Sequence, residues 1–335
     1  MKLTNTTEVY NTMIAFGASA ALNTALELGL FWRLAGQPDT ADGIAQSFDL
    51  PLRRCRAWLE LLVNMGLLEH DEEIYMVSSA TRTAILEAYS QTTWALQAQA
   101  RHAWYPAGVD LPANFQYPHS VLTIQGRQPP DEYRRLEEDP AWAAAFTRAL
   151  YELHLPLAIE LAETLDMSGV QRMMDLGGGS GVVSLELLRR YPQLTCVVVD
   201  QEQVCITGRA IAAENGLADR ITYHPADFLR NDLPPGFDLV LECDVGIYEL
   251  PLFRKVHAVL HPQGRLVLVG PWAPGKGMSP VGQEIMTFLH TLQDPDFEFK
   301  VVAETQAILA AAGFKDFAVQ TLSEGRYLVE VHKAG

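Results

Sequence analysis

The sequence has few cysteines, few basic residues and no long apolar run. Its four cysteines are far apart and unevenly spaced, which matches neither a paired-cysteine zinc site nor a disulfide framework, so we expect a reducing cytoplasm. With 25 Lys and Arg against 41 Asp and Glu, the net charge of −16 repels phosphate polymers and excludes a general nucleic-acid binder. No segment has the roughly 18 uncharged apolar residues of a membrane helix, and the N-terminal residues do not resemble a signal peptide. We therefore expect a protein that is neither secreted nor membrane-bound.

The first hundred residues are predicted to be mainly helical. Hydrophobic residues make up 48% of the 335 residues, enough for the cores of about two domains. In the first part they recur every three or four positions, which is typical of amphipathic helices. Thr40 precedes one such helix, a second ends at a turn at Gly66, and a hairpin-like segment follows. This order indicates an α-helical, winged-helix-like domain over residues 1–105.

Residues 106–168 are predicted to connect this domain to a second one. Six prolines stand between positions 105 and 140 and exclude long regular elements there, whereas a long helix is expected up to about Leu165. Over residues 169–335, short apolar strands alternate with helices, which predicts a parallel sheet covered on both faces. A turn at Gly325 makes the last strand antiparallel. The expected α/β fold is a Rossmann-like, doubly wound, mostly parallel sheet behind the helical domain.

The first predicted strand of this sheet leads into a glycine-rich turn and a helix. Gly177, Gly179 and Gly181 allow a tight turn and the close approach of a ligand to the free N–H groups of the helix. A dinucleotide requires G-x-G-x-x-G, whereas S-adenosylmethionine has no phosphate and carries an ammonium group that favours a carboxylate. The spacing here is G-x-G-x-G and Asp175 ends the strand. Both features favour S-adenosylmethionine.

Acids also end the next two predicted strands. Asp200 lies at the carboxyl end of the second strand, where its carboxylate can bind both ribose hydroxyls. Asp227 follows the third strand and can bind the adenine amino group, while the ring of Phe228 can cover the base. Since parallel strands end at the same edge of a sheet, the three acids are predicted to form one crevice.

With DLGGGSG, VVVD and ADF in this order, residues 170–335 resemble the class I S-adenosylmethionine-dependent methyltransferases. The helical front half is similar to the dimerisation domain of the small-molecule O-methyltransferases, both the caffeate type of plants and the bacterial natural-product and pigment enzymes. This resemblance implies a homodimer, and the apolar first helices agree with it. It implies cofactor binding by Gly177, Gly179, Asp200, Asp227 and Phe228. It also places Leu150 and His154 where the family often has Met and Ser beside the methionine moiety.

The family's catalytic histidine is missing. In the family it follows the fourth strand, in a run resembling H-x-x-H-D-W, and takes the proton of the acceptor hydroxyl. This chain has ECDVGIYE in that segment, with Ile247 in the place of the base. The catalytic candidates are His290, in a segment that lines the acceptor pocket in the family, and Tyr248, at the sheet edge. Cys243 is a cofactor-binding candidate, its neighbours Glu242 and Asp244 are candidates to orient the cofactor or substrate, and no metal is expected.

The sequence thus predicts a methyltransferase for a small, aromatic or lipophilic natural-product or pigment acceptor. Aromatic residues gather where the family builds its acceptor site, at positions 94, 104, 105, 115, 117, 142 and 146. The methylated atom stays open, because a family branch that methylates a bacteriochlorophyll ring carbon also lacks the histidine. Two other functions stay open as well. One is a cofactor-binding family member that has lost methyl transfer. The other is a winged-helix transcription regulator, although residues 41–80 carry seven acids and three basic residues where DNA binding needs positive charge.

Overall fold

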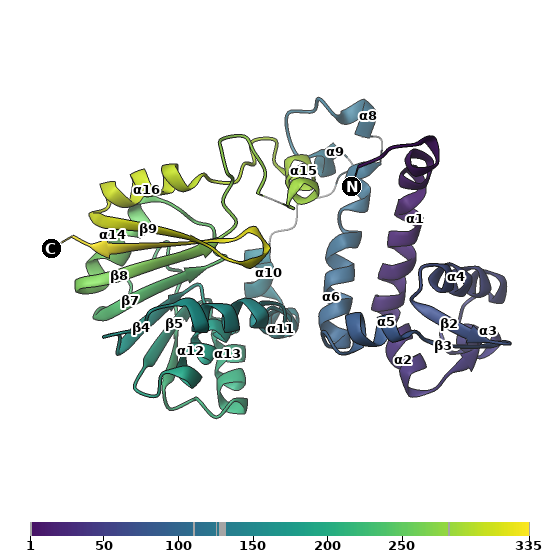
Figure 1. Cartoon of the computed structure of the whole chain (residues 1–335), viewed down its shortest axis with the longest axis horizontal. Coiled ribbons are helices and arrows are strands. Elements are labelled where there is room, and N and C mark those ends of the chain that lie inside the picture. Colours follow the sequence, from purple (N-terminus) through teal and green to yellow (C-terminus); the bar gives the residue numbers. More distant parts are fainter. Residues whose placement is uncertain (1, 110, 125, 127–131, 281, 335) are drawn as a thin grey trace. The chain divides into compact units, whose positions relative to one another are not determined.

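The computed structural model describes residues 2–109, 111–124, 126, 132–280 and 282–334. The chain divides into two compact units, residues 1–109 and residues 110–335 (Figure 1). Each unit has a hydrophobic core of its own. No single helix among the described residues is long and apolar enough to cross a membrane, and the first two helices pass that test only as a pair bent by 59°.

The first unit is mainly helical. Its helices are α1 (Thr6–Leu28), α2 (Leu30–Gly36), α3 (Ala41–Ser47), α4 (Leu52–Asn64), α5 (Ser79–Thr81), the π-helix η1 (Arg82–Leu86), α6 (Gln91–His102) and α7 (Tyr105–Gly108). The strands β1 (Asp39–Thr40), β2 (Leu68–Asp71) and β3 (Ile74–Val77) form an antiparallel sheet in the order β1-β3-β2. The order of helix, helix and hairpin expected from the sequence is present as α3, α4, β2 and β3.

Short-range signals set the ends of these helices. The side chain of Asn5 accepts a hydrogen bond from the backbone N–H of Glu8 at the start of α1. Gly29 ends α1 in the left-handed conformation, with a φ of 72°. Thr40 caps α3 by accepting a hydrogen bond from the N–H of Gly43. The buried side chains of α1 to α4 then form the core of the unit, which includes Leu30, Phe31, Ile44, Leu59 and Leu62.

The second unit begins with helices and continues as an alternation of strands and helices. Its first helices are α8 (Leu111–Asn114), α9 (Val121–Ile124), α10 (Glu132–Glu138) and the long α11 (Pro140–Thr164), which continues through Pro156. The strands are β4 (Arg172–Leu176), β5 (Thr195–Asp200), β6 (Ile221–Pro225), β7 (Phe237–Cys243), β8 (Leu260–Gly270), β9 (Phe314–Thr321) and β10 (Tyr327–Lys333). The helices between them are α12 (Val182–Arg190), α13 (Glu202–Glu214), α14 (Leu250–Val259), α15 (Glu284–Gln293), α16 (Val302–Ala311) and the short 3-10 helix η2 (Ser323–Gly325).

These seven strands form one sheet in the order β6-β5-β4-β7-β8-β10-β9. The strands β6, β5, β4, β7 and β8 are parallel to one another, and β10 is antiparallel to both β8 and β9. This arrangement confirms the predicted α/β fold with its antiparallel end. The chain leaves β4 toward β5 on one side and reaches β7 on the other, and open sheets of this kind bind ligands at such a switch point.

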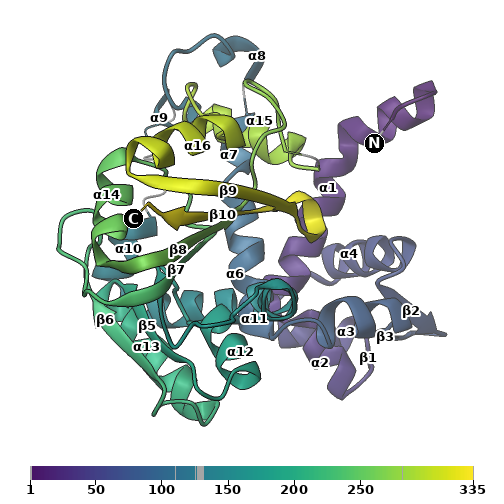
Figure 2. The same cartoon turned by 60° about the vertical axis from the view of Figure 1, so that its left-hand side comes forward.

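Helices cover both faces of the sheet, as Figures 1 and 2 show. One core cluster lies between the sheet and α11, α12 and α13, and the other lies between the sheet and α14 and α16. The consecutive residues Met173 and Met174 of β4 are both fully buried but belong to different clusters. Side chains alternate between the faces of a strand, so a strand that is covered on both sides is apolar throughout.

Candidate functional site

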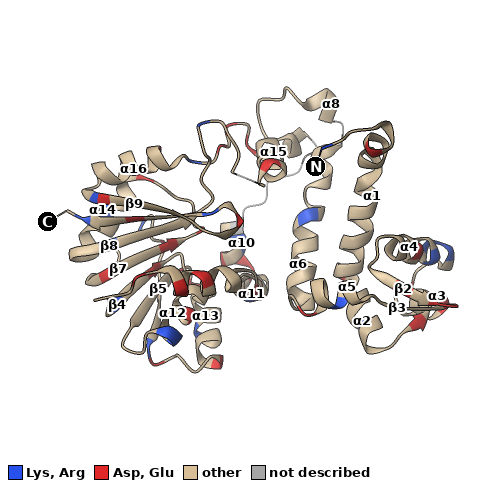
Figure 3. Cartoon of the chain, in the orientation of Figure 1, with Lys and Arg blue, Asp and Glu red and all other residues tan. Residues whose placement is uncertain are grey.

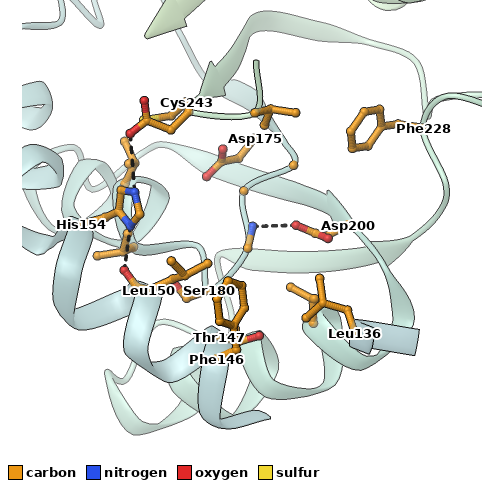
Figure 4. Close-up of a pocket in the computed structure, with 18 of the residues that line it drawn as sticks. Leu136, Phe146, Thr147, Leu150, His154, Asp175, Ser180, Asp200, Phe228 and Cys243 are labelled. Atoms are coloured by element: carbon orange, nitrogen blue, oxygen red, sulfur yellow. Dashed lines mark hydrogen bonds and ion pairs between the residues drawn. The ribbon is translucent and has the colours of Figure 1, made fainter. Parts of the chain in front are cut away.

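A cavity of about 330 Å³ lies at the carboxyl end of the parallel strands, next to the glycine-rich turn (Figure 4). Residues of α10 and α11 line one wall, and the turn after β4 and the ends of β5 and β7 line the others. The structure brings most of the candidate residues together here. The cavity is lined by Asp175, Gly177, Gly179, Asp200, Phe228, Cys243 and His154.

The glycine-rich turn keeps one wall of the cavity free of side chains. Gly177 has a φ of 68°, and a Cβ there would lie 2.5 Å from a methyl group of Val245, so a larger residue would clash. Gly179 has a φ of 58°, and no heavy atom lies within 4 Å of the place where its Cβ would be. The backbone at Gly179 therefore faces open space, into which a ligand can approach closely.

Asp175 is 1% exposed and lies under this turn. The hydroxyl of Ser184 donates a hydrogen bond of 2.5 Å to its carboxylate, and the Cys196 thiol donates to the same hydroxyl at 3.0 Å. Burial raises the pKa of Asp175 to about 6, and the nearby charge of Asp200 adds to the rise. The site therefore holds a buried carboxylate that a cationic ligand would stabilise.

Asp200 lies at the end of β5, on the other side of the turn. One carboxylate oxygen accepts the N–H of Gly179 at 2.8 Å, and the other accepts the N–H of Gln201 at 2.7 Å. Burial raises its pKa although both hydrogen bonds oppose the rise. Figure 4 shows Asp200 and Phe228 at one side of the cavity and His154 and Cys243 at the opposite side. A ligand that contacts both sides must extend past Asp175.

His154 and Asp244 lie close together at that opposite side. The Nδ1 atom of His154 lies 3.0 Å from the carbonyl oxygen of Leu150, and its Nε2 lies 3.5 Å from a carboxylate oxygen of Asp244. The guanidinium of Arg326 donates to the same oxygen at 3.1 Å. Burial opposes ionisation of Asp244, but the contacts with His154 and Arg326 lower its pKa below the usual value. Neither this pairing nor the contribution of Arg326 was predicted from the spacing of residues in the sequence.

Three candidate residues lie elsewhere. Asp227 accepts the N–H of Leu229 within its own turn, and it is absent from the described lining of the cavity. Tyr248 is 9% exposed and stacks on Trp272 with 5.2 Å between the ring centroids, and burial raises its pKa. His290, on α15, stacks on Phe297 at 4.6 Å. Neither Tyr248 nor His290 is among the described residues that line the cavity.

The end of β7 carries two further buried groups. Burial raises the pKa of the Cys243 thiol. Glu242 is 2% exposed, accepts the N–H of Gly246 at 2.8 Å, and has a pKa that burial raises to about 8. Within the described ranges, no group of three or more His, Cys, Asp and Glu side chains is arranged to hold a metal ion.

The chain is similar to known proteins in both sequence and fold. The family profile of the O-methyltransferase domain matches residues 123–315. The N,N-dimethyltransferase OxyT of Streptomyces rimosus is 26% identical over 304 residues, which cover 90% of this chain and 88% of OxyT. The 3-hydroxy-5-methyl-1-naphthoate 3-O-methyltransferase of Streptomyces sahachiroi is 32% identical over 222 residues, 66% of this chain and 62% of that protein. The solved structure of PigF with SAH has a TM-score of 0.83 at 23% identity, over 98% of this chain and all of PigF.

Proposed function

The chain belongs to the family of O-methyltransferase domains and is a methyltransferase that uses S-adenosylmethionine, and we propose that the cavity beside the glycine-rich turn holds this cofactor. The family profile matches more than half of the chain. The observation that carries the proposal is the position of the Asp200 carboxylate, at 2.8 Å from the backbone of the open turn at Gly179. A nucleoside there has a place for its ribose and room beside the backbone.

The donor and acceptor groups of the cavity fit the cofactor. Asp200 would bind the ribose hydroxyls, and Phe228 would contact the adenine from the same side. Asp175, buried between the two sides, would bind the ammonium of the methionine part. This cation would offset the free-energy cost of burying the carboxylate charge. When bound, S-adenosylmethionine supplies an electrophilic methyl group on a sulfonium. His154 and Cys243 line the side of the cavity where this methyl group would lie.

The acceptor that we propose is a small aromatic or lipophilic natural product or pigment, methylated on oxygen or carbon. The relative from Streptomyces sahachiroi is described as acting on a hydroxynaphthoate, which is a flat aromatic molecule. In this chain the wall from α10 and α11 contains Leu136 and Phe146, which lie on the Asp200 side of the cavity and would pack against the nucleoside, so the acceptor would bind beyond the His154 and Cys243 side.

We also propose that two copies of the chain associate through α1. This helix carries charged residues only near its two ends, at Glu8 and Glu27 (Figure 3). Its first half exposes large apolar side chains, namely Tyr10, Met13, Ile14 and Phe16, each at least 60% exposed. Such a patch favours association with another protein surface. Sedimentation of the wild-type chain as a dimer and of the Ile14→Glu variant as a monomer would support a homodimer, and a monomeric wild type at micromolar concentration would refute it.

Calorimetry with S-adenosylhomocysteine tests the cofactor site. We expect wild-type protein to bind this product and to show no binding of NAD. The Asp200→Asn variant should bind it at least about 10-fold more weakly, since a hydrogen bond to a charged group contributes about 1.5–3 kcal/mol. The matched control is Asp219→Asn, which makes the same charge change at an exposed residue. Equal affinity of the two variants would contradict the assignment.

Methyl transfer is then measured with labelled S-adenosylmethionine and a panel of simple phenols, hydroxynaphthalenes and enols. Label in a product identifies the acceptor class and the methylated atom. Retained binding of S-adenosylhomocysteine with no label in any product would favour a family member that performs other chemistry.

A further inference from the structure

Methyl transfer to a hydroxyl group needs a group that takes the hydroxyl proton. Ile247, which the sequence predicts in the place of the family's histidine, packs against the core cluster that includes residues of α14 and carries no base. Among the described residues that line the cavity, only His154 carries an imidazole. The acidic pKa shift of Asp244 makes its carboxylate a weak base, and burial keeps the Cys243 thiol protonated. Because Asp175 and Asp200 would bind the cofactor, His154 is the base that the described lining offers to an acceptor.

The helix fixes which ring nitrogen of His154 can accept a proton. The carbonyl oxygen of Leu150, one turn earlier on α11, only accepts hydrogen bonds, so Nδ1 at 3.0 Å must carry a hydrogen and donate it. In the neutral ring the lone pair is then on Nε2. This nitrogen points to the side of the cavity where Asp244 lies. The geometry thus selects the tautomer that a base at Nε2 requires.

Asp244 is placed to stabilise the protonated ring. Its carboxylate oxygen lies 3.5 Å from Nε2, longer than an ordinary N–H···O hydrogen bond but close enough for a strong charge interaction. Arg326 donates to the same oxygen at 3.1 Å, and its other end donates to Glu324 at 2.8 Å. These contacts keep Asp244 ionised, so its negative charge faces Nε2 when a proton arrives there. Asp175 is the other carboxylate in this part of the cavity lining.

We propose that His154 is the general base of the reaction, with Leu150 and Asp244 as the groups that set its tautomer and stabilise its charge, and Arg326 as the residue that positions Asp244. The inference rests on the proposed function. The acceptor O–H bond breaks as its proton moves to Nε2, and a lone pair of the oxygen forms the new bond to the methyl carbon. The electron pair of the broken S–C bond stays on sulfur. The positive charge of the sulfonium is thereby replaced by the positive charge of the imidazolium beside Asp244.

The first test needs no acceptor. In ¹⁵N-histidine-labelled wild-type protein, NMR distinguishes a ring protonated on Nδ1 from one protonated on Nε2. We expect the neutral His154 ring to carry its hydrogen on Nδ1, and we expect Asp244→Asn to move the protonation of this ring to lower pH. The signal is assigned by its loss in His154→Gln. A neutral ring protonated on Nε2 would overturn the proposal, because its lone pair would then face away from the cavity.

The second test uses an acceptor found in the panel. We expect His154→Gln to lower kcat about 100-fold or more and to remove the acidic limb of the pH profile. Its affinity for S-adenosylhomocysteine should stay within about threefold of wild type, which also shows that the variant is folded. Asp244→Asn should keep the acidic limb but shift it to lower pH, a change that a purely structural role would not produce.

His261→Gln is the matched control. His261 forms a similar pair with Asp238, 3.0 Å between Nδ1 and the carboxylate, at a half-exposed position outside the cavity lining. We expect this variant to behave as wild type in both tests. A wild-type chain that does not bind S-adenosylhomocysteine contradicts the proposed function itself. Binding and transfer by wild type, together with an unchanged rate in His154→Gln, would overturn only the assignment of the base.

Discussion

Replacement of Asp175 by Asn should make the protein without cofactor more stable at neutral pH while it weakens cofactor binding. The carboxyl group is 1% exposed, and burial raises its pKa from the usual 3.8 to about 6. The folded chain therefore holds this proton more tightly than the unfolded chain does. The contribution of the protonated group to stability is fully present below about pH 4 and is lost as the pH rises through 6.

The size of the effect follows from the difference between the two pKa values. About 2 units at about 1.4 kcal/mol each give a loss of roughly 3 kcal/mol in the free energy of unfolding between pH 4 and pH 7. Asn has nearly the same shape, can still accept the hydrogen bond that Ser184 donates to Asp175, and does not ionise. The variant should therefore lack this part of the pH dependence. Because Asp200 and Glu242 also titrate from buried positions, the difference between variant and wild type is the informative quantity.

Urea unfolding at pH 4.5, 5.5, 6.5 and 7.5 measures this difference. The gap between the two unfolding free energies should grow with pH in favour of Asp175→Asn and level off above about pH 6.5. Asp219→Asn, with the same charge change on the surface, should keep a constant gap to wild type. Calorimetry with S-adenosylhomocysteine should show weaker binding by Asp175→Asn at pH 7.5, and wild-type affinity should approach that of the variant below pH 6. Parallel stability profiles of wild type and Asp175→Asn would refute the reasoning.

Two further substitutions probe the packing around the site. Gly208→Ala would place a Cβ 2.2 Å from the ring of the buried Tyr223, whose hydroxyl donates to the carbonyl of Ser180 in the glycine-rich turn. We therefore expect urea unfolding to show a loss of about 1–3 kcal/mol in the free energy of unfolding. An unchanged midpoint would show that the ring moves freely. Glu242→Gln removes a buried carboxyl group whose pKa is about 8. The free energy of unfolding should therefore fall less between pH 5 and pH 8 in the variant than in wild type. Identical pH profiles would show that this carboxyl group does not cause the fall.

The fold and most of the cavity follow from local patterns in the sequence. Apolar strands such as β4 indicate a sheet covered on both faces, and parallel strands end at one edge, so Asp175 and Asp200 had to meet near the turn at Gly179. What a strand end does not determine is the direction of each side chain. Asp227 also follows a strand, but its carboxylate accepts the N–H of Leu229, the local turn that Asp commonly forms, and it does not line the cavity as described.

The side chains of Tyr248 and His290 also lie where their positions in the sequence do not predict them. Both follow strands that end at the correct edge, so their positions along the chain are compatible with a site. The ring of Tyr248 is drawn into the core because Gly270 leaves space for it: a Cβ at Gly270 would lie 2.8 Å from the tyrosine hydroxyl. Trp272 then stacks on the ring. This burial depends on a glycine more than twenty residues away, and the spacing of residues around Tyr248 contains no sign of it.

The pair of His154 and Asp244 depends on an unusual backbone conformation. Asp244 has a φ of 56°, a left-handed conformation that Asp adopts more readily than most residues with a side chain. With ordinary strand geometry, side chains alternate between the faces of the sheet, and a carboxylate after Cys243 would continue that alternation. The left-handed turn ends the alternation and lets this carboxylate contact both His154 and Arg326. An acid directly after a strand that enters a Gly-containing turn is thus a signal to examine for a partner on another element, here a histidine ninety residues earlier in the chain.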